Sequence, residues 1–213
     1  MPRKRKYELR KRAADMAETR RRITEAAVDL HGTIGPSRTT LSAVAERAGV
    51  QRHTLYRHFP TEEELFQACS AHYFAANPLP DLEPWRGMGD PGERLARALH
   101  ELYAFYERTA PMFANVLRDA ELVDAMRPTL APLEGYLAEA AEVLGAGLPV
   151  GDGRRHVLTA ALRHAMDFAT WRSLAGTGRI TRGEAVALIT ALVEAAAGAQ
   201  LDGCQEGREP PQP

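Results

Sequence analysis

A seven-residue stretch near the N-terminus concentrates side chains that donate and accept hydrogen bonds. It reads Arg-His-Thr-Leu-Tyr-Arg-His and occupies residues 52–58. Arginine can donate two hydrogen bonds to a guanine edge or a phosphate, and hydroxyl and imidazole groups add single contacts. A helical core seldom collects so many planar polar groups. We therefore expect this stretch to touch something outside the protein, and nucleic acid fits its chemistry.

Two short helices must position these side chains. Apolar residues recur at helical spacing over 41–48, after Thr39 or Thr40 as a capping residue. Gly49 suits the left-handed turn that ends this helix. The stretch 52–58 then forms a second helix. A supporting helix begins near Arg20, with Ile23, Ala26, Ala27 and Leu30 on one face. This order predicts a helix-turn-helix, whose second helix enters the major groove of DNA.

The segment resembles the TetR family, the tetracycline-repressor-like one-component regulators. The matching residues form five runs, at 20–27, 39–41, 44–50, 54–59 and 63–66. Together they cover about residues 19–66. Beyond this segment, the chain is similar to the family only in the number and length of its helices.

The resemblance implies a role for each polar residue of the motif. Thr40 is expected to cap its helix and touch phosphate. Tyr56 and His58 are expected to contact the DNA backbone. Base reading falls to Arg52 and His53, with Thr54 and Tyr56 assisting. Arg57 completes the expected DNA-binding set of Thr40, Arg52, His53, Thr54, Tyr56, Arg57 and His58.

Three positions depart from the family pattern. Glu62 stands near where a phosphate-binding lysine is common, so binding should be weakened unless Arg57 or the basic arm substitutes. Gln51 replaces a Ser or Thr that commonly caps the recognition helix. His31 stands where an aromatic residue often packs.

The charge of the chain is divided unevenly. Residues 1–60 hold 14 Lys and Arg against 6 Asp and Glu, a balance of +8, and the remainder balances at −9. A basic end on an acidic body favours the binding of a polyanion at the basic end alone. For residues 1–12 an inert solvated tail is the alternative to contact along the minor groove or on phosphates.

The periodicity predicts an all-α protein of about nine helices without strands. We expect a basic N-terminal arm (1–18), a three-helix helix-turn-helix DNA-binding domain (19–66), a larger helical ligand-binding and dimerisation domain (67–202) and a disordered tail (203–213). Residues 77–92 form a linker. Pro111 should separate a short piece, 112–119, from the helix before it. Pro128 and Pro132 should kink a helix over 122–144, and one long helix should cover 154–174.

The resemblance also implies a small-molecule pocket in the body and a dimer formed by the last two helices. Candidate pocket residues lie on three body helices, and ordinary core packing is the alternative for each: Tyr103, Tyr106, Phe113, Met126, Tyr136, His164, Phe168 and Trp171. His156 and His164 have no accompanying cluster of metal-ligating residues. We expect neither a metal site nor a cofactor.

The function that we expect is transcriptional repression by a homodimer on a palindromic double-stranded DNA operator, released by a small lipophilic or aromatic ligand. Control by a protein partner, control by no ligand at all, and activation are the alternatives. An enzyme is disfavoured, because no phosphate-binding loop, catalytic triad or carboxylate pair is present in the sequence. The sequence has no signal-peptide core and no apolar run of ~20 residues, so we expect a cytoplasmic protein that does not enter the membrane. Cys69 and Cys204 are expected to be free thiols.

Overall fold

The computed structural model describes residues 2–151 and 153–198, and for the side chains of residues 2–6 and 9 it gives no detail. The described residues form ten α-helices, two 3₁₀ turns and no strand, so the all-α prediction is confirmed. In chain order the elements are α1 (Pro2–Thr33), η1 (Pro36–Arg38), α2 (Leu41–Arg47), α3 (Arg52–His58), α4 (Glu62–Ala76), α5 (Glu83–Arg86), α6 (Pro91–Asp119), η2 (Asp124–Met126), α7 (Arg127–Gly145), α8 (Arg155–Ala165), α9 (Phe168–Leu174) and α10 (Arg182–Gly198).

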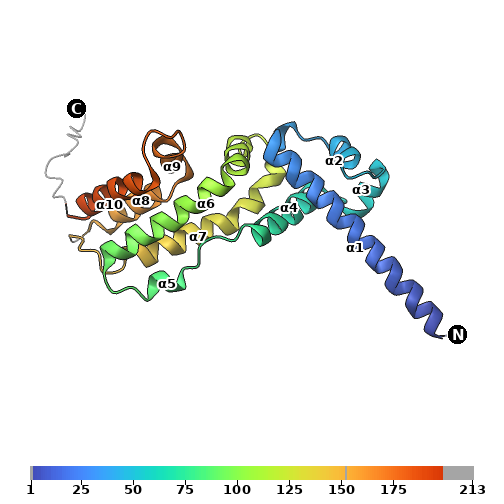
Figure 1. The fold of residues 1–213 in the computed structure, drawn as a ribbon, viewed down its shortest axis with the longest axis horizontal. Helices are drawn as coiled ribbons and strands as arrows, with labels where there is room; N and C mark the ends of the chain where they lie inside the picture. Colours follow the sequence, from blue (N-terminus) through green and yellow to red (C-terminus); the bar gives the residue numbers. More distant parts are fainter. Residues whose placement is uncertain (1, 152, 199–213) are drawn as a thin grey trace, which may run out of the picture.

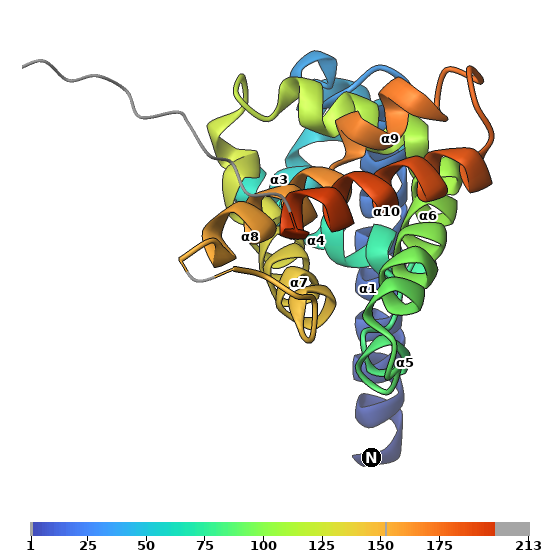
Figure 2. The same cartoon turned by 90° about the vertical axis from the view of Figure 1, so that its left-hand side faces the viewer.

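Two hydrophobic cores divide these helices. The smaller core lies among α1 to α4 at one end of the molecule and includes Ile23, Val44, Leu55, Phe59 and Leu65. The larger core joins α5 to α10. Figure 1 shows the first group at one end, with the start of α1 extending away from it, and the body helices at the other. The view in Figure 2 shows α10 beside α8 across the end of the body.

Side-chain caps fix where several helices begin. Thr40 accepts a hydrogen bond from the amide of Ala43 at 3.1 Å, and Thr61 accepts one from Glu64 at 3.2 Å. Asp90 accepts from Glu93 at 2.8 Å at the start of α6. A cap of this kind stabilises a helix by about 1 kcal/mol. These starts confirm the capping signals in the sequence.

The predicted break at Pro111 is wrong, because α6 continues through it to Asp119. Pro111 lies on the exposed side of the helix. On the buried side, Phe105 and Phe113 meet edge to face, with ring centroids 5.4 Å apart. We attribute the continuity of the helix to this packing, which can offset the hydrogen bond that proline removes.

The single helix predicted over 154–174 is also wrong, because the chain breaks between α8 and α9. Asp167 accepts a hydrogen bond from the amide of Ala169 at 2.6 Å and so starts α9. The hydroxyls of Tyr103 and Tyr106 donate to the carbonyls of Ala165 and Met166, at 2.8 and 2.7 Å. Tertiary hydrogen bonds thus satisfy backbone groups that the break leaves free.

Two further boundaries differ from the sequence prediction. The helix predicted over 122–144 starts later, as α7 after the turn η2, and Pro128 lies in its first turn, where proline is tolerated. The linker predicted at 77–92 contains α5, which is anchored by buried Trp85. The Trp85 indole donates to Glu101 at 2.8 Å.

The predicted tail 203–213 and Cys204 lie outside the described residues. Cys69 is buried, and burial raises the pKa of its thiol to about 12. None of the described helices combines the length and apolar character that crossing a membrane requires.

Candidate nucleic-acid interface

The turn between α2 and α3 has the geometry that a helix-turn-helix needs. Gly49 adopts a φ of 64°, and its amide donates to Glu46 at 3.0 Å while the amide of Val50 donates to Ala45 at 2.9 Å. This pair of hydrogen bonds is the glycine-dependent motif that ends many helices. A Cβ at Gly49 would stand 2.9 Å from Nη2 of Arg22. Both the backbone conformation and the close neighbour therefore favour glycine.

Two arginines of α1 brace the motif from behind. Arg22 donates to the carbonyl of Ala48 at the end of α2. Arg20 donates to the carbonyl of His58 at the end of α3, and its guanidinium lies 4.0 Å from the centroid of the Phe59 ring. Cations at helix C-termini satisfy free carbonyls and interact well with the helix dipole. Both arginines lie in the run 20–27 of the family motif, but the sequence holds no local signal of this bracing role.

The outer face of α3 presents most of the predicted DNA-contacting side chains. Arg52, His53, Tyr56 and Arg57 are exposed, and Thr54 is half-buried. Leu55 is fully buried and fixes the opposite face of the helix. Five of the six polar side chains of α3 are therefore at least partly exposed.

Arg52 and Tyr56 form a pair on this face. Nη2 of Arg52 donates to the Tyr56 hydroxyl at 3.0 Å, and the guanidinium carbon lies 5.5 Å from the ring centroid. The arrangement holds the arginine over the aromatic ring, one helical turn away. Contact between Arg52 and a base edge would require this hydrogen bond to open or be shared.

His58, for which the resemblance implied contact with the DNA backbone, is buried. Its side chain is only 7% exposed, and its Nε2 has no hydrogen-bond partner among the described residues. Burial lowers the pKa of His58, and the nearby charges of Arg57 and Arg20 lower it further. A lowered pKa disfavours the charged imidazole that attracts a phosphate most strongly, and contact of His58 with the DNA backbone stays a prediction.

Polar residues at the helix starts flank the recognition face: Thr40 begins α2, Gln51 precedes α3, and three glutamates begin α4. Thr40 is exposed at the start of α2 with its hydroxyl in the cap, so it lies at the surface where a phosphate could be met. Gln51 makes no side-chain cap at the start of α3, as its residue type indicated. Glu62, Glu63 and Glu64 begin α4 as three exposed carboxylates. They stabilise the helix start but add negative charge beside the motif.

Comparisons with known proteins agree with this geometry. Residues 23–69 match the profile of the family described as bacterial regulatory proteins, tetR family. The HTH-type transcriptional regulator SrpR of Pseudomonas putida is 41% identical over 76 residues, which cover 34% of this chain and 36% of SrpR. The HTH-type transcriptional repressor Rv3405c of Mycobacterium tuberculosis is 32% identical over 127 residues, which cover 56% and 64%.

The fold as a whole is also similar to that of a solved structure. A TetR-like transcriptional regulator from Rhodococcus superposes with a TM-score of 0.60 over 85% of this chain and 97% of its own, at 22% identity. Residues 23–69 therefore carry the DNA-binding segment of the TetR family, and the chain as a whole has a fold similar to that of a TetR-like regulator. The family consists of transcription regulators rather than enzymes. The chain spans only about one to two thirds of the length of the curated relatives named above.

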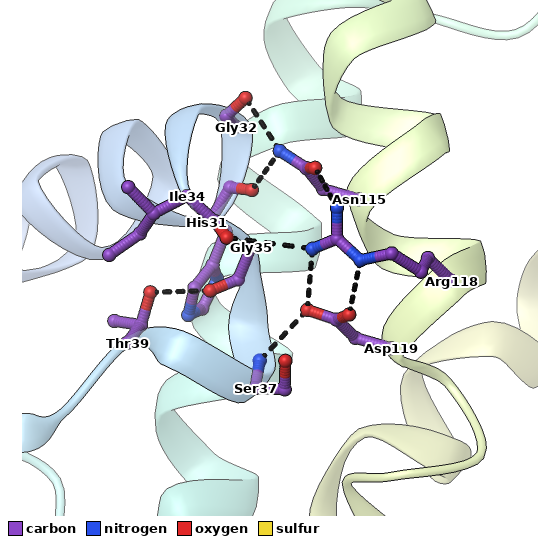
Figure 3. Close-up of polar contacts among 9 residues, drawn as sticks. All are labelled: His31, Gly32, Ile34, Gly35, Ser37, Thr39, Asn115, Arg118 and Asp119. Carbon is purple, nitrogen blue, oxygen red and sulfur yellow. Dashed lines mark hydrogen bonds and ion pairs between the residues drawn. The ribbon is translucent and has the colours of Figure 1, made fainter.

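A polar junction ties the end of α6, which lies beyond the matched segment, to the end of α1 within it (Figure 3). Nδ2 of Asn115 donates to the carbonyls of His31 and Gly32, at 3.1 and 2.9 Å. Asp119 is buried, and it accepts from the amide of Ser37 at 3.0 Å and from Nε of Arg118 at 2.7 Å. The hydrogen bond from Arg118 lowers the pKa of Asp119 to about 2. These contacts fix the DNA-binding helices to the body of the protein.

Gly35 makes the close approach at this junction possible. Its φ is 96°, and a Cβ there would lie 2.5 Å from Oδ2 of Asp119 and would also collide with Arg118. From its residue type alone, Gly35 indicates only a break between two helices. The residues that require it are more than 80 positions away, so no local signal indicated them.

The eight predicted pocket residues do not share one cavity. Tyr106, Phe113, Phe168 and Trp171 pack into an aromatic cluster with centroid distances of 5.3–5.9 Å. The remaining four lie apart from this cluster or on its edge: Tyr103 is buried against Ala165, Tyr136 donates to Pro80 at 2.9 Å, His164 is exposed on α8, and Met126 lies in η2.

Phe113 and Met126 line a cavity between α1, α4, α6 and α7. Aromatic residues at helical spacing indicate a buried face. From the sequence alone, such a face does not show whether its rings fill a core or line a pocket. Within residues 2–151 and 153–198, no three His, Cys, Asp or Glu side chains are grouped closely enough to hold a metal ion.

Proposed function

We propose that this protein is a homodimeric, sequence-specific repressor that binds a palindromic operator in the cytoplasm and is released by a small lipophilic or aromatic molecule. The observation that carries the proposal is the exposed face of α3. It presents Arg52, His53, Tyr56 and Arg57 from a helix that two arginines of α1 brace. We assign base reading to Arg52 and His53, because the start of the recognition helix reaches deepest into the major groove.

Phosphate contacts come from the flanks of this face. Thr40 at the start of α2 and Arg57 near the end of α3 are exposed. The basic arm is the start of α1 and not an extended chain. A helix is ~10–12 Å across with its side chains, whereas the minor groove is ~6 Å wide. We therefore assign the arm to phosphates and set aside the minor groove as its site.

The dimer is proposed to form through α8 and α10, which pack side by side. Leu188 and Leu192 lie one turn apart on the outer face of α10, and they are 45% and 55% exposed. Two such pairs from two chains would bury these leucines in a four-helix bundle. Because the chain breaks before α9, α8 alone, and not the whole predicted helix 154–174, contributes to the proposed bundle.

Control without a ligand remains the second candidate, because one observation favours it. The aromatic cluster of the body is filled by its own side chains. The separate cavity that Phe113 and Met126 reach favours ligand control instead.

Measurement of DNA affinity at several salt concentrations tests the roles assigned to the basic arm and to the exposed face of α3. Deletion of residues 1–12 should flatten the plot of log affinity against log salt while leaving sequence preference intact, because phosphate contacts release counterions. Tyr56→Phe should weaken binding to all sequences alike, with the slope unchanged. An unchanged slope after the deletion would show that the arm does not touch DNA. Sedimentation as a monomer at assay concentration would refute the bundle.

A further inference from the structure

The polar junction of Figure 3 holds two successive parts of the DNA-binding segment. Asn115 of α6 donates to the carbonyls of His31 and Gly32 in the last turn of α1, at 3.1 and 2.9 Å. Asp119 accepts from the amide of Ser37 at 3.0 Å, and Ser37 lies in η1, the turn that precedes α2. The end of α6 therefore fixes both α1 and the approach to the helix-turn-helix.

Arg118 joins the two halves of the junction. Its Nη1 donates to Oδ1 of Asn115 at 2.8 Å, and its Nε and Nη2 donate to the two carboxylate oxygens of Asp119, at 2.7 and 3.1 Å. A bidentate pair of this kind fixes geometry as well as adding energy. Gly35 leaves the room that Arg118 and Asp119 need to come this close. The three side chains of α6 therefore act as one rigid unit.

At its other end, α1 supports the recognition helix. Arg20 donates to the carbonyl of His58 at the end of α3, and Arg22 donates to that of Ala48 at the end of α2. From Arg20 to Gly32, α1 rises by ~18 Å at ~1.5 Å per residue. A turn of ~10° about the junction therefore moves the end of α3 by ~3 Å, nearly the ~3.4 Å rise of one base pair.

DNA demands such a turn when the distance between two half-sites changes. One added base pair moves the half-sites apart by ~3.4 Å and rotates one against the other by ~35°, because a turn of DNA holds ~10–10.5 base pairs. Two chains that share this change must each turn their recognition helix by ~17°. At the surface of a helix ~10 Å across, a turn of ~17° shifts the groups of the junction by ~1.5 Å.

The hydrogen bonds of the junction do not stretch that far. The three that join α6 to α1 and η1 measure 2.9–3.1 Å, and N–H···O hydrogen bonds in proteins seldom exceed ~3.2 Å. Apolar packing is not directional, so it permits sliding that hydrogen bonds do not. A chain with an intact junction therefore keeps its recognition helix in one orientation.

We propose that Asn115, Arg118 and Asp119 determine which half-site spacing this protein accepts. They are positioning residues: α3 contacts the bases, and the junction fixes the distance and angle between the two recognition helices of a dimer. The inference rests on the proposed function, because it requires a dimer that binds a palindrome.

A series of operators tests the proposal. It starts from the palindrome that the full-length chain selects from random DNA, and its members are longer or shorter at the centre by one or two base pairs. Asn115→Leu removes both hydrogen bonds to α1. For a change of one base pair, the wild type should lose at least about tenfold more affinity than this variant. The wild type must break two hydrogen bonds per chain that the variant already lacks, each worth about fivefold.

Arg118→Met is a second variant, which should fold more readily because the Arg118 side chain is 50% exposed. It should also flatten the dependence of affinity on spacing, with the base preference of each half-site unchanged. Arg97→Met is the matched control, because Arg97 is an exposed arginine of α6 that pairs with a carboxylate away from the junction. It should keep the spacing preference of the wild type.

The ratio of affinities between spacings distinguishes positioning from stability. A variant that is only less stable loses affinity for all operators alike, so its ratios stay those of the wild type. Such unchanged ratios in both junction variants would overturn the proposal. An equally flat dependence in Arg97→Met would overturn it too.

A measurement without DNA separates this inference from the proposed function. Spin labels at two exposed positions, Ala17 of α1 and Ala138 of α7, report the orientation of α1 against the body by pulsed electron resonance. Labelled chains carry Cys204→Ser and are diluted with unlabelled ones. Asn115→Leu should broaden the distance distribution relative to the wild type, and equal widths would refute the role of the junction. Failure to select a palindrome would refute the proposed function, and the widths would still show whether the junction holds α1.

Discussion

Replacing His31 by phenylalanine should remove a pH-dependent part of the stability of this fold. The His31 side chain is 6% exposed and stacks on Phe66. Burial lowers the pKa of His31 from 6.5 to about 4, and the carboxylate of Asp119 opposes this only in part. Phenylalanine keeps a flat ring in the same space and cannot take up a proton.

The size and sign of the effect follow from the two pKa values. The unfolded chain takes up this proton near pH 6.5 and the folded chain only near pH 4, a difference equivalent to about 3 kcal/mol. Because the unfolded state binds the proton first, this stability is complete above pH ~6.5. It is lost as the pH falls through the window to about 4.

Urea denaturation at several pH values measures the loss. Between pH ~7 and pH ~4.5 the wild type should lose about 2 kcal/mol more unfolding free energy than His31→Phe, with similar m-values. His156→Phe is the matched control, because His156 is exposed on α8, and it should follow the wild type. Parallel pH profiles for wild type and His31→Phe would refute the account of a buried, neutral His31.

Three further substitutions address the interface and the junction. Arg52→Ala should cost ~1–3 kcal/mol at one base pair of each half-site in a competition assay, and an equal loss on every sequence would make Arg52 a phosphate contact instead. Glu62→Lys should tighten DNA binding and steepen the salt dependence by about 0.9 if it gains one phosphate contact, whereas an unchanged slope would place the start of α4 away from DNA. Gly35→Ala should lower the unfolding free energy by at least ~1–3 kcal/mol, because φ is 96° there and the new methyl group meets Asp119; a stability equal to that of the wild type would contradict the junction geometry.

Local signals were enough to predict the helix-turn-helix. The cap at Thr40, the turn at Gly49 and the buried side of α3 all depend on neighbours within a few residues. The burial of His58 could not be predicted in this way. Its burial depends on α1, where Arg20 holds the end of α3 from 38 positions away in the chain.

The body was harder to predict because its packing is not local. The end of α8 is fixed by Tyr103 and Tyr106, about 60 residues earlier in the chain. Asp167 before Phe168 was the one local signal of a new helix start, and the apolar periodicity around it obscured that signal. An aromatic stripe alone does not reveal whether its rings fill a core or surround a cavity, and here most of them fill a core.

Selection of DNA from a random-sequence pool by the purified full-length chain tests the central claim most directly. The account predicts enrichment of a palindrome, with two half-sites about one helical turn apart as two recognition helices require. Arg52→Ala should relax the preference at one position in each half-site. Binding that enriches no sequence, or the same palindrome selected unchanged by Arg52→Ala, would contradict the assignment of α3 as the base-reading helix.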